Sequence, residues 1–364
     1  MRPLRGVVVL ASGAIAVALL VAGAPDAGAN NPRWIKANFH AHGQRDLVYD
    51  DGRLAPADLH QVYARAGYDL SIHSAHTMSR AFTAADWATQ RAQEAGTIGS
   101  TRTALGQEVT VANGPRFWGG LNIGSLRSIA KNNNHMGAFG HDQAVGHGLS
   151  VAAAADAAHA AGAATTVNHP GPGPGMWEWG YWDLPGNREK FDAIEVYNGY
   201  LLSVVGYFGF GTFEGVYRRA TSPQGYDLKL AVSAGTDAHG DKAHRSTGCW
   251  VLAASNDPLD VAQAVKERKT VAITGHGFQS LRIVSVAHLG EVIQAGQADL
   301  GIELDRKVRK VVLWKNGAKV KTWRRTKSVR HRVTTSAKAC YVWTATGDFL
   351  GRDRLMTSGI WLEP

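Results

Sequence analysis

The chain has 364 residues, 45% of them hydrophobic and 19% charged, which is typical of a folded protein with room for about two domains. These values exclude a disordered tail and a small disulfide-stapled scaffold. The net charge of +9 is uneven, because residues 302–364 hold 15 Lys and Arg against 5 Asp and Glu. Any polyanion partner is therefore expected at the C-terminal end.

The N-terminus has the pattern of a secretory signal. Arg2 and Arg5 precede an uncharged, apolar run over 6–24, and Ala27-Gly28-Ala29 offers small residues for cleavage. We expect residues 1–29 to be removed and the mature protein to be secreted or extracytoplasmic, with no membrane segment. A retained anchor is the alternative, because the run approaches the about 20 residues that span a bilayer.

The segment 30–277 is expected to form an α/β domain. Apolar runs alternate there with amphipathic stretches, with helices predicted at 56–66, 84–94, 151–161 and 259–268, and strands at 68–72, 103–111, 164–168, 191–197, 228–234 and 270–273. This alternation predicts a parallel sheet covered by helices, either open or closed into a barrel.

The segment 278–364 changes to a period of two residues, which predicts strands. The runs are 280–286, 299–304, 310–314, 319–323, 329–334, 340–344 and 360–362, and Asn316-Gly317 is a strong hairpin signal between two of them. We expect a small antiparallel β-sandwich as a second, basic domain.

Imidazoles and carboxylates gather at the ends of the predicted strands. His40 and His42 are two residues apart at one strand end, so both side chains point to the same side. Asp237 and His239 repeat this spacing. Further candidates are His73, His76, Glu108 and His169. Because sites in parallel sheets form at the carboxyl ends of strands, these residues predict a centre for zinc, manganese or iron.

Six motifs in order carry a family resemblance. They are Phe39-His40-Ala41-His42, Gly67-Tyr68-Asp69 leading to His76-Thr77, Gly106-Gln107-Glu108, Asn168-His169-Pro170, the run 192–199, and Gly235-Thr236-Asp237-Ala238-His239. Together they resemble the polymerase-and-histidinol-phosphatase (PHP) family over residues 36–275, and most of all its carbaryl-hydrolase-like branch. The C-terminal segment also resembles the β-domain of that branch.

The resemblance implies a distorted (β/α)7 barrel with two, or at most three, divalent ions and phosphoester hydrolysis as the common activity. By position, His40, His42, Glu108 and Asp237 would hold one ion. Glu108 would bridge to a second ion, which His169 also holds. His76 and His239 would serve a third ion, and Glu195 and Asn198 would support the ligands.

Two departures from the family pattern bear on the second and third ions. Ala75 stands where the family usually has Asp, and Gly120 stands where it often has His. One imidazole is therefore missing unless His73, His135, His141 or His147 replaces it. We favour two ions on this ground.

The resulting expectation is a secreted metal-dependent phosphoesterase that hydrolyses a small phosphomonoester or phosphodiester with metal-activated water. His76 or His239 would pass a proton to the leaving group, and Arg245 would bind the substrate phosphate. Aromatic residues in the loop 170–182 would either line the pocket or anchor the loop. The alternatives are an amide or carbamate hydrolase and a binding module with a decayed site.

The basic C-terminal segment leaves two interpretations open. Its Lys and Arg residues would bind nucleic acid or another polyanion, or they would only solvate and protect exposed strands. Cys249 and Cys340 form either one disulfide or two buried thiols.

Overall fold

The computed structural model describes residues 31–44, 50, 52–77, 80–94, 96–111, 135–170, 185–199, 210–240, 247–275, 281–347 and 353–364. Four sequence predictions lie outside these ranges: the signal peptide at 1–29, the altered position Gly120, the aromatic part of the loop 170–182, and Arg245. Residues 32–364 belong to one structural unit.

A mixed sheet carries the first part of the described chain. In order, its paired strands are β1 (Arg33–Asn38), β2 (Leu70–His76), β4 (Thr101–Thr110), β5 (His135–Phe139), β6 (Ala164–Val167), β7 (Ala193–Asn198) and β8 (Ala231–Gly235). A bridge between Ala41 and Ala238 then brings the chain beyond β8 beside the chain beyond β1. The carboxyl ends of these two strands are thus held together.

The predicted parallel sheet is in fact a mixed one. β5 runs antiparallel to both β4 and β6, and β9 (Thr247–Ala253) runs antiparallel to β1 and β10 (Thr270–Thr274). β3 (Thr97–Ile98) forms a short hairpin with β4. The sequence of β5, with Gly137 at its centre, lies in a glycine-rich stretch and gave no strand signal.

The described helices are α1 (Pro56–Arg65), α2 (Ala84–Ala92), α4 (Val151–Ala160), α6 (Phe210–Thr221) and α7 (Pro258–Lys266), with a 3-10 turn η1 (Arg188–Lys190). Side-chain hydrogen bonds at the N-terminus fix where several of these helices begin. Thr83 and Asp86 form a capping box at α2, Ser150 caps α4, and Asp257 caps α7. The four predicted helices are confirmed within two residues at each end.

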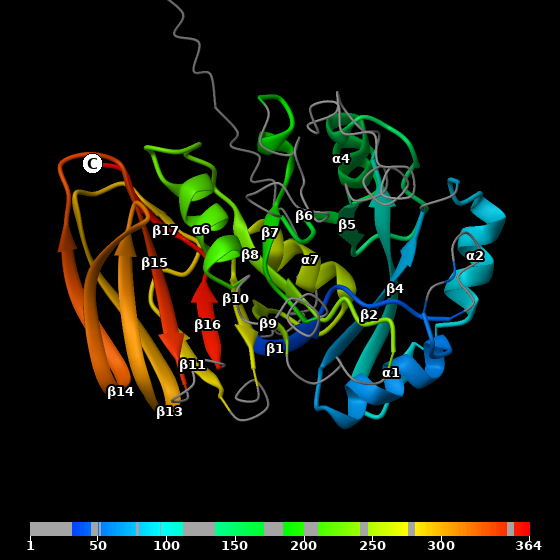
Figure 1. The fold of residues 1–364 in the computed structure, drawn as a ribbon, viewed down its shortest axis with the longest axis horizontal. Helices are drawn as coiled ribbons and strands as arrows, with labels where there is room; N and C mark the ends of the chain where they lie inside the picture. The colour runs from blue at the N-terminus through cyan, green and yellow to red at the C-terminus, as the bar shows by residue number, and fades with distance from the viewer. Residues whose placement is uncertain are drawn as a thin grey trace, which may run out of the picture. The chain divides into compact units, whose positions relative to one another are not determined.

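The C-terminal strands are β11 (Ile283–Val286), β12 (Val292–Ile293), β13 (Gln297–Lys315), β14 (Ala318–Thr334), β15 (Ala339–Thr346), β16 (Arg354–Thr357) and β17 (Ile360–Leu362). Figure 1 shows β13, β14 and β15 side by side. The hairpin at Asn316-Gly317 is confirmed, with φ values of 50° and 79°. β16 pairs with β10, so hydrogen bonds join these strands to the first part of the chain.

The interior is continuous across the chain. Cys340, Met356 and Trp361 belong to the same hydrophobic cluster as Ile35 and Val232. Cys249 and Cys340 are both buried and free, so the disulfide alternative is wrong. Burial raises the pKa of Cys340 to about 12. In the part of the chain that the structure describes, no helix is both long and apolar enough to cross a membrane.

Candidate metal centre

Two pairs of side chains meet where β1 and β8 end. His40 and His42 flank Ala41, and Asp237 and His239 flank its bridge partner Ala238. Both pairs turn toward the same space. His42 Nε2 lies 3.1 Å from Asp237 Oδ1, and His40 Nε2 lies 3.3 Å from the same oxygen.

The register of β2 and β4 adds the next two side chains. His76 pairs directly with Glu108, and His76 Nδ1 lies 3.1 Å from Glu108 Oε2. Ala75 is buried in a separate apolar cluster with Phe82 and Trp87. The change at position 75 therefore takes place on the opposite face of β2 and removes no group from this site.

Of the four histidines considered as a replacement imidazole, the structure places His135 beside Glu108. β5 is antiparallel to β4, with Gly137 opposite Glu108 and His135 two residues away on the same face. His135 Nδ1 consequently lies 3.2 Å from Glu108 Oε1. The sequence named His135 only as one of four alternatives, because the strand that carries it was not recognised.

The other three alternatives are placed differently. His73 Nδ1 bonds Glu94 Oε1 at 2.9 Å, and the ring of His141 stacks on Trp87. His147 belongs to none of the described groups with metal-ligand spacing.

Glu108 is the centre of the cluster. Its carboxylate oxygens lie within 3.3 Å of imidazole nitrogens from five histidines, and both partners of each pair are less than a tenth exposed. These histidines are His40, His42, His76, His135 and His169. The sequence-predicted ligands are thus brought together, with His135 added to them.

The spacing of the donor atoms fits a metal ion. Bonds of about 2.0–2.2 Å at tetrahedral angles place neighbouring ligand atoms about 3.3–3.6 Å apart. The Nε2 atoms of His40 and His42 lie 3.0–3.3 Å from oxygens of Glu108 and Asp237. Buried His40 Nε2 makes no hydrogen bond despite these short distances. Groups of three such residues recur four times in the cluster, with shared members.

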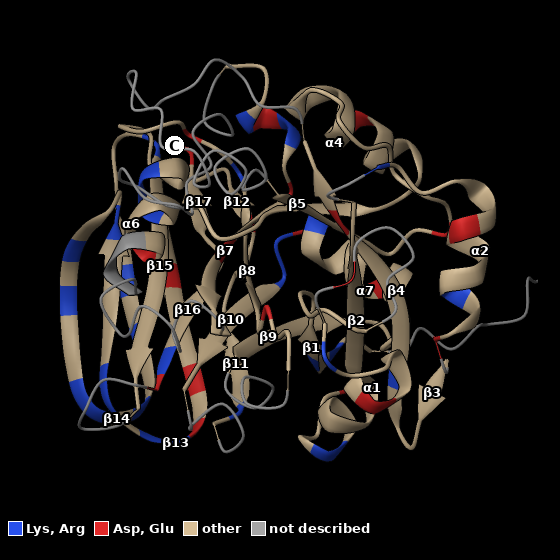
Figure 2. Ribbon diagram, turned by 45° about the vertical axis from the view of Figure 1, so that its right-hand side comes forward, with Lys and Arg blue, Asp and Glu red and all other residues tan. Residues whose placement is uncertain are grey.

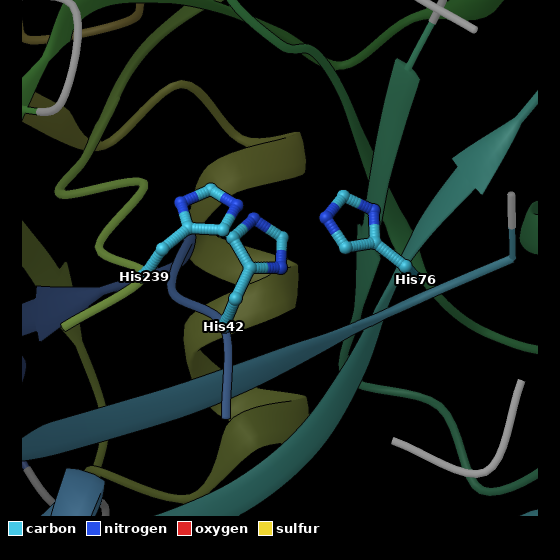
Figure 3. Close-up of side chains that lie close together, drawn as sticks. All are labelled: His42, His76 and His239. Atoms are coloured by element: carbon cyan, nitrogen blue, oxygen red, sulfur yellow. The ribbon is translucent and has the colours of Figure 1, made fainter. Parts of the chain in front are cut away.

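Figure 3 shows one of these groups, formed by His42, His76 and His239. The rings of His42 and His76 are stacked with centroids 4.0 Å apart, and those of His42 and His239 are 4.3 Å apart. Two protonated rings would repel each other at this distance. The group is therefore suited to neutral imidazoles that share a cation.

For Glu108 and His42 the electrostatics of the site favour the protonation states that bind metal. Burial alone would raise the pKa of Glu108, but the charges of His135, His40 and His76 hold it well below its ordinary value. Burial and the charges of His76 and His239 lower the pKa of His42 to about 3. The carboxylate is thus ionised and the His42 imidazole neutral, as a metal ligand must be.

His40 shows the opposite shift. Burial would lower its pKa, but Glu108, Asp237 and Glu195 outweigh burial and raise it well above the ordinary value. A cation bound among the same oxygens would displace that proton. Metal affinity is therefore expected to rise with pH.

A second layer of side chains orients the ligands. Glu195 lies 3.1 Å from His40 Nδ1 and accepts a hydrogen bond from the backbone N–H of His169 at 2.7 Å. Asn198 donates to Asp237 Oδ2 at 3.1 Å and to Glu195. The contacts to His40 and Asp237 use the outer atom of each side chain and leave its inner atom for the centre. The supporting roles expected for Glu195 and Asn198 fit this geometry.

Two of the clustered residues have a left-handed backbone. The φ of His169 is 33° and that of Asp237 is 47°, a region that non-glycine residues seldom adopt. Such conformations persist where surrounding contacts over-determine them, and they concentrate at functional sites. The bond from the His169 N–H to Glu195 is one such contact.

The chain was compared with protein-family models, curated proteins and solved structures. No protein-family model and no curated protein matches the chain. A solved structure from Bacteroides vulgatus ATCC 8482 is described as a two-domain protein containing a predicted PHP-like metal-dependent phosphoesterase. It is 16% identical, with a TM-score of 0.49, and the match covers 91% of this chain and 95% of that chain.

The neighbour's description names the PHP-like family that the motifs resemble. The carbaryl-hydrolase branch is not named there and stays a prediction. Because the identity is low, we base the functional assignment on the side chains of this chain.

Proposed function

We propose that this chain is a metal-dependent phosphoesterase of PHP type, with a distorted (β/α)7 barrel and a C-terminal β-sandwich. The single observation that carries the proposal is Glu108, a buried carboxylate within 3.3 Å of imidazole nitrogens from five histidines. No structural core needs such a group, because burying it without a cation leaves many polar atoms poorly paired.

Two divalent ions would be held in the cluster, and Glu108 would serve as a ligand for both. His40, His42 and Asp237 would complete one ligand set, and His135 and His169 would complete the other. These donors are nitrogen and carboxylate oxygen, which suits zinc, manganese or iron. His76 and His239 extend the site and would complete a third set with His42.

Bound divalent ions would supply Lewis acidity and a water of lowered pKa for attack on phosphorus. The chain's own residues set the surroundings of that reaction. His239 is 24% exposed at its side chain, whereas the other clustered side chains are less than a tenth exposed. Its Nδ1 lies 3.0 Å from the Asp237 carbonyl oxygen, which orients the ring. With two ions bound and no third, His239 would exchange a proton with the leaving group.

We also propose that Arg245 binds the substrate phosphate, because it follows the Asp-x-His motif closely in the sequence. Export remains part of the proposal as well, supported by the apolar leader and its small-residue cleavage motif.

The test combines metal analysis of the purified protein with hydrolysis of para-nitrophenyl phosphate and its bis-ester. We expect two ions per chain, loss of turnover on chelation, and recovery on adding manganese or zinc. His135→Ala should lose one ion and most of the turnover, whereas His147→Ala, the matched control, should lose neither. Absence of tightly bound metal would overturn the proposal. Turnover of aryl carbamates instead of phosphoesters would favour the carbamate alternative.

A further inference from the structure

The longest hairpin of the described chain carries a dense positive charge. β14 spans 17 residues, or about 55 Å at the usual rise per strand residue. Figure 2 shows Lys and Arg in blue along β13 and β14. The exposed basic residues of β14 are Lys319, Lys321, Arg324, Arg325, Lys327, Arg330 and Arg332.

Little of this charge is neutralised within the protein. In the described ranges, only Arg332 of this set has an ion pair, with Asp299. The charges also act on their neighbours. Burial and then the positive charge of Lys321 lower the pKa of His331.

The edge of β14 is open but is not suited to a peptide strand. β14 pairs with β13 and with no other described strand. Its ladder with β13 is interrupted twice, between the pairs Glu303–Ser328 and Val308–Thr326 and again at Val320, where β14 has one extra residue. Arg325, next to the first interruption, has a φ of 51°. Such bulges block the continuous hydrogen bonding that an added strand requires. A partner at this edge would therefore be bound by the long Lys and Arg side chains and not by backbone hydrogen bonds.

We propose that the β13–β14 hairpin binds a linear phosphodiester polymer. The charge is spread along an extended strand on both faces, which matches a chain of regularly spaced anions better than a compact ligand. Lys and Arg both bind phosphate well, and counterion release drives such binding. The surface is separate from the metal centre, so the inference does not depend on the proposed function.

The alternative is that the charge only protects an open edge from aggregation. Glutamate protects an edge as well as lysine does, so charge reversal separates the two roles. The test variant is Arg324→Glu with Lys327→Glu and Arg330→Glu. The matched control has the same change of net charge on exposed residues elsewhere, Arg33→Glu with Arg65→Glu and Arg102→Glu.

The probe is a fluorescent single-stranded 30-nucleotide DNA, followed by anisotropy over a range of salt concentrations. We expect the hairpin variant to bind at least tenfold more weakly, with a salt slope reduced by about 2 because three phosphate contacts are lost. The control variant should stay within about twofold of the unchanged protein. The corresponding Gln triple variant, checked for unchanged metal content and thermal stability, should lose affinity in the same direction.

Three outcomes would overturn the inference. The unchanged protein could fail to bind the DNA, the hairpin and control variants could weaken binding equally, or poly-glutamate could compete as well as the DNA does. The last result would identify a carboxylate-rich protein partner instead of a phosphodiester.

Discussion

At the scale of single residues, the site depends on groups that hold the ligands in place. Glu195 contacts His40 Nδ1 and the backbone of His169, two segments that are far apart in the sequence. It thereby fixes the imidazole tautomer and the left-handed turn at the same time. Positioning groups of this kind affect metal affinity almost as much as the ligands do.

Glu195→Gln tests this role. We expect the metal dissociation constant to rise about 10–100-fold, because the amide cannot accept from both His40 and the His169 N–H. Competition with a fluorescent chelator measures the constant. Glu267→Gln, an exposed change on the surface, is the control. An unchanged constant in Glu195→Gln would show that Glu195 does not position the ligands.

Glu94 is a second buried carboxylate, outside the metal centre. It contacts His60 and His73. Burial would raise its pKa, but these two histidines outweigh burial and lower it to about 2. The pKa of Glu94 is lower in the folded protein than the about 4.3 of an unfolded chain. Ionised Glu94 therefore stabilises the fold, and this contribution is fully present above about pH 4.3. This stabilisation is lost as the pH falls toward 2.

Glu94→Gln should therefore cost about 2–3 kcal/mol of folding free energy at neutral pH. Its deficit relative to the unchanged protein should shrink as the pH falls from about 4.5 to 2. Chemical denaturation of both proteins across this range measures the effect. A deficit that stays constant with pH would contradict the assignment.

At the scale of elements, the closeness of β1 and β8 decides the geometry of the site. A Cβ atom at Gly235 would lie 2.2 Å from His40 Cβ and 3.0 Å from Glu195 Oε1. Only glycine allows β8 to approach His40 this closely. The Gly-Thr-Asp-Ala-His motif thus begins with a packing requirement as well as supplying ligands.

Gly235→Ala should destabilise the fold by about 2 kcal/mol or more and weaken metal binding, since the backbone beside His40 must move. Gly215→Ala is the matched change, because it lies within α6 with open space around its Cβ. It should stabilise the protein by about 0.5–1 kcal/mol. Thermal unfolding and metal titration measure both effects. Equal effects of the two changes would contradict the packing argument.

At the scale of the whole described molecule, the C-terminal strands are joined to the part that carries the metal centre. Arg354 of β16 donates to Glu214 of α6 at 2.8 Å, and Tyr197 of β7 donates to the other oxygen of Glu214 at 2.7 Å. The next residue, Asn198, holds Asp237. Ser358 and Gly359 also bond to β8 and α6.

A double-mutant cycle can measure the coupling free energy between Arg354 and Glu214. Arg354→Met should cost about 3 kcal/mol, because it leaves the Glu214 carboxylate buried without its cation. Adding Glu214→Gln should recover most of that loss. The free energies of unfolding of the two single variants and the double variant give the coupling. Additive effects would mean that the pair does not link the two parts.

The sequence by itself determined much of the local structure and most members of the clustered site. Helix caps, the Asn316-Gly317 turn and apolar periodicity are local signals, and they placed four helices to within two residues and several strands nearly as well. They missed β5 and β9, and they divided β13 and β14 into two runs each. His40, His42, Asp237 and His239 were recognisable because their spacing of two follows directly from strand geometry. His76, Glu108 and His169 were recognisable from their places at strand ends.

Only the tertiary structure decided which strands meet and in which direction. The antiparallel course of β5 brings His135 beside Glu108, and the face of β2 directs Ala75 away from the site. Neither fact is encoded in local periodicity, because pairing direction depends on contacts between segments far apart in the chain. The pairing of β10 with β16 is another such long-range contact. It joins the segments 30–277 and 278–364, which look like separate domains in the sequence. Such contacts arise only when the whole chain packs.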